Sequence, residues 1–217
     1  CRIYADAFAA NIDRWTVEAG TAAHDTDHME LSAAGTLVLS SATNDGAAYF
    51  LSVLRCPDDN KVFWVIADAV DDANYHALKI EFRYSGAATR IQLYKVTGGA
   101  PAAIGTAADT LTHFDADQAI VVQLCLTAAG QFIAALGDGG ISVAAFTSRH
   151  SGGDKIGFLL ESAGTTLLID NVDWQTEQSD RQMCPECPQF CSGCRGEFEL
   201  TISGAADNGG CTNCNEL

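Results

Sequence analysis

Six cysteines crowd the end of this chain, at spacings that fit either metal binding or disulfide formation. They lie in CPECPQFCSGC, residues 184–194, and in CTNC, residues 211–214. Two Cys-x2-Cys pairs separated by a longer loop match a zinc ribbon, in which four thiolates hold one tetrahedral ion. The zinc interpretation uses Cys191, Cys194, Cys211 and Cys214.

Disulfides are the favoured alternative for the same segment. Three closely spaced pairs suit three disulfides, whereas the zinc interpretation leaves two thiols over. In an oxidising compartment thiols pair with each other rather than bind metal. The spacing fixes no connectivity. The cysteines concerned are Cys184, Cys187, Cys191, Cys194, Cys211 and Cys214.

Three further cysteines bring the total to nine. Cys56 ends an apolar stretch and Cys125 lies inside another, so a disulfide across a sandwich is one expectation. Two buried free thiols, acting as small apolar side chains, are the equal alternative. Because the total is odd, Cys1 indicates a bond to another chain or to a removed segment.

The stretch HDTDH, residues 24–28, gathers two imidazoles and two carboxylates. Both groups bind divalent metals. The stretch lies between VEAGT and MELSAAG, which favours a solvated hairpin turn over a metal site.

Aromatic side chains on expected strands are candidates for a sugar-binding platform. Such a platform needs exposed rings beside convergent polar groups. We expect Phe63, Trp64 and Phe82 in the core. The candidate rings are Tyr49, Trp64, Tyr75, Tyr84 and Tyr94.

The charge balance excludes two classes of partner. The chain of 217 residues has 28 acidic and 12 basic side chains, a net charge of −16. Nucleic acids and anionic membranes need a basic face, so neither is expected. The most apolar stretch, AIVVQLCLTAAGQFIAALG, is interrupted by Gln123, Gly130 and Gln131 and predicts no membrane span.

Alternating apolar and polar residues predict the elements that position these groups. In HALKIEFRYS, residues 76–85, apolar side chains alternate with Lys79, Glu81 and Arg83, as in a strand with one buried face. Similar short runs recur between turn signals such as PDDN, TGGAP and GDGG, which favours an all-β antiparallel sandwich. The stretch AAIGTAADTL, residues 102–111, is expected to hold a helical turn at most, and a mixed α+β domain is the alternative.

A polar stretch, QTEQSDRQ, reads as a linker after the sandwich. We place the sandwich at residues 1–178 and the linker plus a Cys-rich C-terminal β extension at residues 179–217. The extension is either the start of a further β domain or an inter-subunit strand. The extension is too short to fold without covalent or metal cross-links.

The order of several stretches resembles the concanavalin A-like, laminin-G-like jelly rolls of large secreted bacterial proteins. The stretches are YADAF, Trp15 and LSAAGTLVLSS near the start, YHALKIEFRYSGAATRIQLYKVTGG in the middle, and IGFLLESAGTTLLIDNVDW at the end. The resemblance covers residues 2–175. It implies two packed antiparallel sheets, with the first and last strands adjacent.

The resemblance also implies what to look for in a site. Glucanases of this kind carry a Glu-x-Asp-x-x-Glu strand, which this sequence lacks, and Glu81 and Glu161 stand apart. Since G-x-S-x-G and H-E-x-x-H are also missing, we expect no enzyme. Many members hold a structural calcium, for which Asp6 and Asp170 are the candidate ligands together with backbone carbonyls.

The favoured function is a non-catalytic extracellular or cell-surface structural or adhesive module, a repeating subunit of a surface fibre. Its partners would be copies of itself, joined through the cysteines and through a strand added to a neighbour's sheet. The alternative is a lectin-like carbohydrate-binding module that binds surface glycans. The proposed assembly strand comprises Glu197, Phe198, Glu199, Leu200, Thr201 and Ile202.

Overall fold

The computed structural model describes the chain in eight stretches. They are residues 3–8, 11–41, 47–84, 88–110, 114–126, 131–137, 142–146 and 148–176. These residues form strands, turns and loops, and none of them lies in a helix, which confirms the expected all-β class. Within these stretches no helix is long and apolar enough to cross a membrane.

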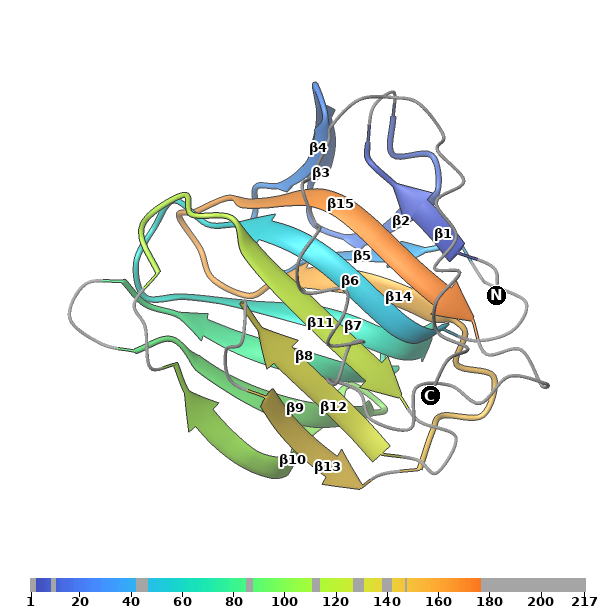
Figure 1. Cartoon of the computed structure of the whole chain (residues 1–217). Helices are drawn as coiled ribbons and strands as arrows, with labels where there is room; N and C mark the ends of the chain where they lie inside the picture. The colour runs from blue at the N-terminus through green and yellow to red at the C-terminus, as the bar shows by residue number, and fades with distance from the viewer. Residues whose placement is uncertain are drawn as a thin grey trace, which may run out of the picture.

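Eight strands form the first sheet, sheet A, which faces the viewer in Figure 1. Its order is β13-β12-β11-β6-β15-β4-β3, and β1 pairs with β15 beside this path. The strands are β1 (Ile3–Asp6), β3 (Ala22–Asp25), β4 (His28–Leu31), β6 (Ala47–Arg55), β11 (Ile120–Leu126), β12 (Gln131–Leu136), β13 (Ser142–Phe146) and β15 (Leu167–Thr176).

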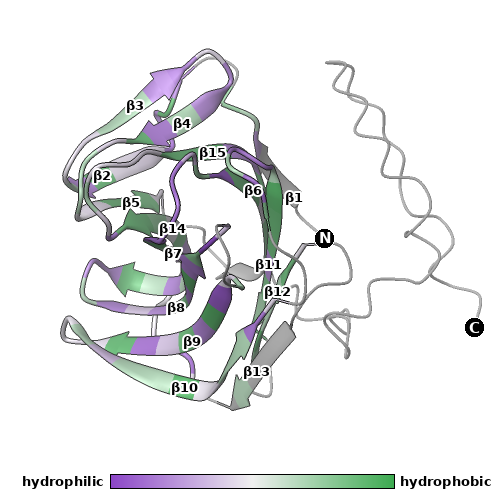
Figure 2. Cartoon of the chain, turned by 90° about the vertical axis from the view of Figure 1, so that its left-hand side faces the viewer, coloured by the Kyte–Doolittle hydropathy of each residue, from purple (hydrophilic) through white to green (hydrophobic). Residues whose placement is uncertain are grey.

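Seven strands form the second sheet, sheet B, in the order β10-β9-β8-β7-β14-β5-β2. All the pairings in both sheets are antiparallel. Figure 2 shows a two-layer sandwich, with most of sheet A on the right, sheet B on the left and the β3–β4 hairpin of sheet A at the top. The strands are β2 (Trp15–Ala19), β5 (Thr36–Ser40), β7 (Lys61–Asp71), β8 (Asn74–Phe82), β9 (Arg90–Thr97), β10 (Ala100–Asp109) and β14 (Lys155–Leu160).

The first and last strands are neighbours, as the sequence resemblance implied. Strand β1 runs antiparallel to β15, with Asp6 opposite Val172 and Tyr4 opposite Trp174. Strand β15 therefore lies between β6 on one side and both β1 and β4 on the other.

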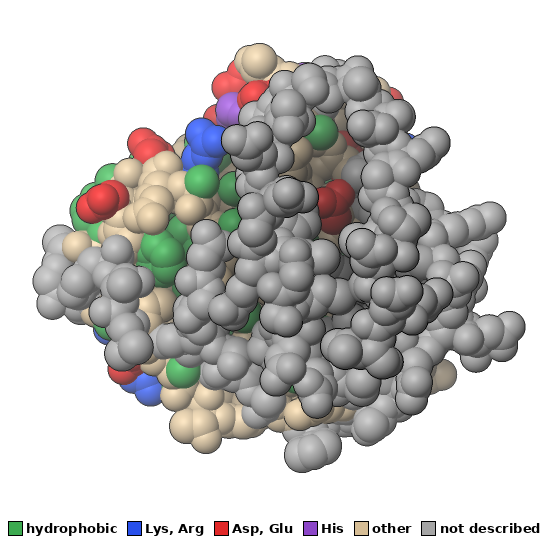
Figure 3. Space-filling view, viewed as in Figure 1, with side chains coloured by type: hydrophobic (Ala, Val, Ile, Leu, Met, Phe, Trp, Pro, Cys, Tyr) green, Lys and Arg blue, Asp and Glu red, His purple; other side chains and the backbone are tan. Residues whose placement is uncertain are grey.

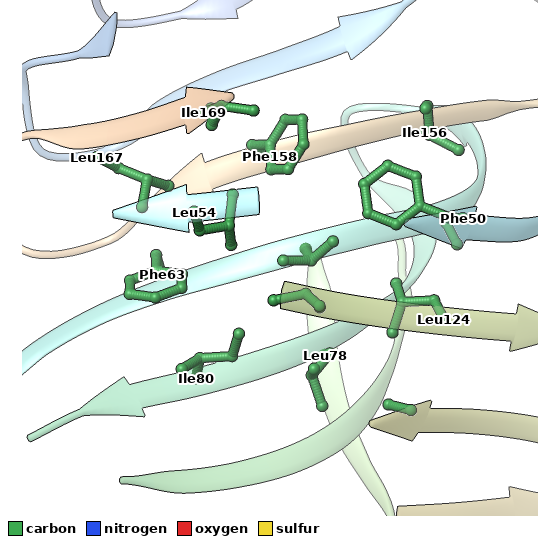
Figure 4. Close-up of a cluster of buried hydrophobic side chains, with 14 of the residues drawn as sticks. Phe50, Leu54, Phe63, Leu78, Ile80, Leu124, Ile156, Phe158, Leu167 and Ile169 are labelled. Atoms are coloured by element: carbon green, nitrogen blue, oxygen red, sulfur yellow. The ribbon is translucent and has the colours of Figure 1, made fainter. Parts of the chain in front are cut away.

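Large apolar side chains fill the space between the sheets (Figure 4). Phe158 of β14 is fully buried, with ring centroids 5.6 Å from Trp15 and 5.7 Å from Phe50. In β8 the alternation read from the sequence holds, since Leu78, Ile80 and Phe82 are all fully buried in this core. The labelled members in Figure 4 are Phe50, Leu54, Phe63, Leu78, Ile80, Leu124, Ile156, Phe158, Leu167 and Ile169.

Sheet B also carries a buried layer on its outer face, which the sequence did not predict. We call it the outer layer; it comprises Leu37, Leu39, Trp64, Ile66, Ala69, Tyr75, Ala77 and Val96. Strand β7 is therefore covered on both sides, which explains its continuous apolar run. Trp64 is buried as expected, but in the outer layer and not in the central core with Phe63.

The sequence did not predict one of the strands. Residues 102–111, where a helical turn was considered, mostly belong to β10, which pairs with β9 on both sides of a register shift between Ile104 and Ala108. The strand is rich in Ala and mostly exposed at the sheet edge, so it shows no alternating pattern. Tertiary pairing, and not local propensity, makes it a strand. The last described strand ends at Thr176, so the boundary at residues 178–179 lies outside the described residues and stays a prediction.

Candidate functional site

The outer face of sheet B gathers aromatic and charged side chains from four neighbouring strands. Because β8 turns its even-numbered residues into the core, Lys79 and Glu81 point outward. Trp64 reaches the same face from β7 and Tyr94 from β9. Glu161 follows directly after β14, the next strand on the other side of β7.

Trp64 is held rigidly at the centre of this group. Its Nε1 donates a hydrogen bond to Glu161 Oε2, and its ring centroid lies 4.8 Å from that of Tyr94, at 54°. The ammonium of Lys79 lies 5.5 Å from the Trp64 centroid, within the range of a cation–π contact. Trp64 is only 6% exposed, so it forms a floor and does not project from the surface.

Lys79 links two carboxylates over this floor. Its Nζ lies 4.0 Å from Glu81 Oε1 and 3.8 Å from Glu161 Oε2. Arg83 adds a second cation, with Nη2 2.7 Å from Glu81 Oε2. The side chains of Glu161, Arg83 and Glu81 are 47%, 34% and 32% exposed. Cationic donors and carboxylate acceptors thus alternate along this row of side chains, where a ligand can reach them.

The candidate aromatic residues do not form one exposed platform. Tyr75 lies in the outer layer, where burial raises the pKa of its phenol. Tyr84 packs on Phe82, with its hydroxyl donating to Pro57 O. Tyr94 is half-buried beside Trp64, and the side chain of Tyr49 lies outside the described residues.

A second polar group lies at the HDTDH stretch, which forms the expected hairpin turn between β3 and β4. Asp25 pairs directly with His28 across the turn. His28 Nε2 lies 3.7 Å from Asp25 Oδ2, and its Nδ1 lies 3.2 Å from Asp27 Oδ1. Glu30 completes a set of ligand-type atoms within 4.8 Å of one another. Figure 3 shows a histidine among acidic side chains near the top of the face of sheet A.

The two candidate calcium ligands have separate partners. Asp6 accepts hydrogen bonds from the backbone N–H of Phe8 and from Trp15 Nε1. Asp170 Oδ2 lies 3.3 Å from Arg55 Nη2. Burial raises the pKa of Asp170, an effect that Arg55 opposes and Asp27 adds to. Asp170 is therefore electrostatically coupled to the β3–β4 hairpin, and a calcium ion at Asp6 and Asp170 stays a prediction.

Two of the nine cysteines, Cys56 and Cys125, lie within the described residues. Cys56 is a free, fully buried thiol whose Sγ lies 3.7 Å from Thr165 Oγ1 and 3.5 Å from Asp58 O. Cys125 is disulfide-bonded to a partner outside the described residues. The expected Cys56–Cys125 pair was thus wrong, because Cys56 faces the core while Cys125 occupies the opposite face of sheet A, beside Ile133. The assembly strand and the other cysteines, with their zinc alternative, lie outside the described residues.

A buried charged network that no sequence pattern indicated lies at one end of the sandwich. Asp68 is fully buried and accepts hydrogen bonds from Arg149 Nε and from the backbone N–H of His150, at 2.9 and 2.7 Å. His76 is also fully buried, and its Nδ1 lies 3.0 Å from Asp68 Oδ2. The network ties the segment after β13 to a bulge in β7.

Neither protein-family models nor curated protein sequences match this chain. Solved structures do. A carbohydrate-binding module, CBM66 from Bacillus subtilis, has a TM-score of 0.60 at 18% identity over 75% of this chain and 96% of its own. A β-1,3-1,4-glucanase (lichenase) from a mouse hindgut metagenome has 0.58 at 11%, over 81% and 99%. A Bacillus subtilis protein of unknown function with a galectin-like fold has 0.55 at 16%, over 81% and 96%.

These neighbours share one architecture with the present sandwich. The chain has the concanavalin A-like jelly-roll fold. In this jelly roll β8, which lies next to the central strand β7 of sheet B, presents Ala77, Lys79 and Glu81 outward in turn.

Proposed function

We propose that this jelly roll is a non-catalytic carbohydrate-binding module and that the outer face of sheet B is its binding surface. The observation that carries the proposal is the convergence of exposed charged groups on a rigid aromatic floor. We call this the sheet B site; it comprises Trp64, Lys79, Glu81, Arg83, Tyr94 and Glu161.

The site has the two components that sugar recognition needs. The half-buried ring of Tyr94 and the buried Trp64 offer apolar contact to the C–H face of a sugar. The heads of Lys79, Glu81 and Glu161 supply donors and acceptors for hydroxyl groups. Because these heads already contact one another, little side-chain freedom is lost when a ligand binds.

Lys79 supports binding over hydrolysis. Glycoside hydrolysis requires one carboxyl group that keeps its proton as the general acid. Lys79 contacts both Glu81 and Glu161, so both carboxylates of the site are already engaged in ion pairs. The likeness to CBM66 adds that the same fold binds carbohydrate elsewhere, and the lichenase shows the alternative use of the fold.

The test is binding of a panel of soluble polysaccharides, neutral and charged, by affinity gel electrophoresis and calorimetry. We expect at least one glycan to bind, without release of reducing ends. Tyr94→Ala should weaken binding by about 1–3 kcal/mol through loss of a stacking surface. Tyr94→Phe, which keeps the ring, should bind nearly as well as the wild type.

A matched change on the other face provides the control. Gln123→Ala alters the outward side of sheet A at a strand position comparable to that of Tyr94. It should leave glycan affinity unchanged. Absence of binding across the panel, or equal effects of Tyr94→Ala and Gln123→Ala, would contradict the proposal, and release of reducing sugar would replace it with a hydrolase.

The proposed setting is extracellular or at a cell surface, where glycans are the partners. A structural calcium at Asp6 and Asp170 belongs to the same proposal, and a melting temperature unchanged by EGTA would remove it. No observation on the described residues favours the fibre-subunit hypothesis, which depends on residues 179–217.

A further inference from the structure

The β3–β4 hairpin places three metal-ligand side chains on one surface. Asp25 and His28 are register partners across the turn. His28 and Glu30 are two positions apart on β4, so they share the face opposite buried Met29. The strand geometry therefore fixes the backbone positions of all three ligands.

His28 lies between two carboxylates. Asp27 Oδ1 is 3.2 Å from its Nδ1, and Asp25 Oδ2 is 3.7 Å from its Nε2. One ring nitrogen thus contacts a carboxylate that can orient the ring, and the other faces a carboxylate with which it could share a cation.

The distances suit a small ion. Metal–ligand bonds of about 2.0–2.1 Å in a tetrahedral site place ligand atoms roughly 3.3 Å apart. The Asp25–His28 separation is close to this value, and all three ligand atoms lie within 4.8 Å of one another. Asp25 is exposed and Glu30 is half-buried, so rotation of these side chains can bring their carboxylate oxygens from within 4.8 Å to the shorter separation that a shared ion needs.

The donor set selects the class of metal. One imidazole nitrogen with carboxylate oxygens suits zinc and its first-row neighbours, whereas calcium requires six to eight oxygens. A carboxylate on the second imidazole nitrogen, as Asp27 provides, is the usual support of a metal-bound histidine.

Asp170 adds negative charge beside the hairpin. Strand β15 pairs Leu168 with Glu30, so Asp170 follows two residues later on the same face. Its carboxylate is coupled to both Asp27 and His28 and is held by Arg55. The field at His28 Nε2 is thus set by several carboxylates from three adjacent strands.

We infer that the β3–β4 hairpin is a binding site for a divalent transition-metal ion of the zinc class, with Asp25, His28 and Glu30 as its protein ligands. The remaining coordination position is open to water or to a ligand oxygen. This site is distinct from the sheet B site and does not depend on the proposed function.

The experiment is titration of the full chain with Co²⁺, followed by visible absorption and calorimetry. We expect one site with nitrogen and oxygen ligation, seen as d–d bands without thiolate-to-metal charge transfer. His28→Ala should abolish it, and Asp27→Asn should weaken it by about 10–100-fold through loss of the supporting carboxylate. Competition by Zn²⁺ should displace the Co²⁺.

Controls separate this site from the cysteine-rich extension and from misfolding. Asp72→Asn, an exposed carboxylate in the β7–β8 turn, should leave binding unchanged. Glu30→Gln provides a second ligand variant if His28→Ala lowers the melting temperature. No Co²⁺ binding, binding that survives both ligand substitutions, or a site with only thiolate charge-transfer bands would overturn the inference.

Discussion

At the residue scale, Asp68 shows how a charged group is kept inside the sandwich. Burial acts to raise its pKa, but the hydrogen bonds from His76 and from the His150 backbone, together with Arg149, outweigh burial and lower it. Gly153 lies so close to Asp68 that a Cβ there would be 2.5 Å from the Asp68 carbonyl oxygen. The network is therefore satisfied only in this tightly packed arrangement.

Replacing Asp68 should be costly. Asp68→Ala removes the carboxylate that contacts the buried His76 and the Arg149 guanidinium, and we expect a loss of about 3–5 kcal/mol in the free energy of unfolding. Urea denaturation at neutral pH measures this loss. Asp72→Ala, at an exposed position of the adjacent turn, should cost less than about 0.5 kcal/mol. Equal losses would show that the network does not stabilise the fold.

The same network predicts sensitivity to acid. Burial, His76 and Lys95 lower the pKa of His150, and the pKa of Asp68 is lowered as described. A lowered pKa in the folded state means that the unfolded state binds protons first as the pH falls. The His150 contribution is present above about pH 6.5 and the Asp68 contribution above about pH 3.9, and each is lost below these values.

Urea unfolding at pH 7.5, 5.0 and 3.5 tests this expectation. The free energy of unfolding should fall at both steps. His150→Gln should reduce the first decrease and leave the second. A stability that is constant from pH 7.5 to 5.0 would contradict the role of His150.

Cys56 should be unreactive in the native protein. Its thiol is fully buried, and burial raises its pKa, so little nucleophilic thiolate forms. We expect iodoacetamide to label it only after unfolding. Peptide mapping under non-reducing conditions should find Cys56 unpaired and Cys125 in a disulfide. Labelling of folded protein at Cys56 would contradict its buried position.

At the scale of elements, β14 depends on a glycine opposite a leucine. Gly157 pairs with Leu39 of β5, and a Cβ at Gly157 would lie 2.3 Å from the Val38 carbonyl oxygen and 2.6 Å from Leu39 Cδ2. The absence of a side chain lets Leu39 cover this position in the outer layer. Strands β5 and β14 can thus approach closely beneath the sheet B site.

A methyl group at this position should strain both strands. Gly157→Ala is expected to cost about 1–3 kcal/mol in the free energy of unfolding, because the added atom displaces backbone as well as a side chain. Thermal and urea unfolding provide the measurement. Lys155→Ala on the same strand serves as the control and should change stability by less than about 0.5 kcal/mol. A neutral Gly157→Ala would mean that the strands separate readily.

At the scale of the whole molecule, the two outer faces have different character. Sheet B presents aromatic and charged groups over a buried apolar layer. Sheet A carries the β3–β4 hairpin at one edge. Glycan binding and metal binding are thus proposed for separate surfaces and can be tested independently.

The cysteines and the extension provide the test of assembly. If the protein is a fibre subunit, a non-reducing gel of natural material should show a ladder that collapses on reduction, and deletion of residues 184–217 should abolish polymers. If it is a monomeric binding module, a single band should appear under both conditions. Polymers that persist after the deletion would refute assembly through the extension.

The sequence alone determined the fold class and most of the strands. Where one face of a strand is buried and the other is wet, as in β8, the alternation of residues reveals both the strand and its core side chains. The alternation does not reveal β10, because its small, exposed residues show no pattern. It also does not indicate the register of β7, because both faces of that strand are buried.

The sites were decided by tertiary structure. The sequence singled out the HDTDH stretch and Asp170, but only the pairing of β4 with β15 brings Asp170 beside His28. It treated Glu81 and Glu161 as separate, yet strand neighbours place both on Lys79. Residues far apart in the chain meet only through strand order and register, which are set by how the two sheets bury their shared core and not by local sequence.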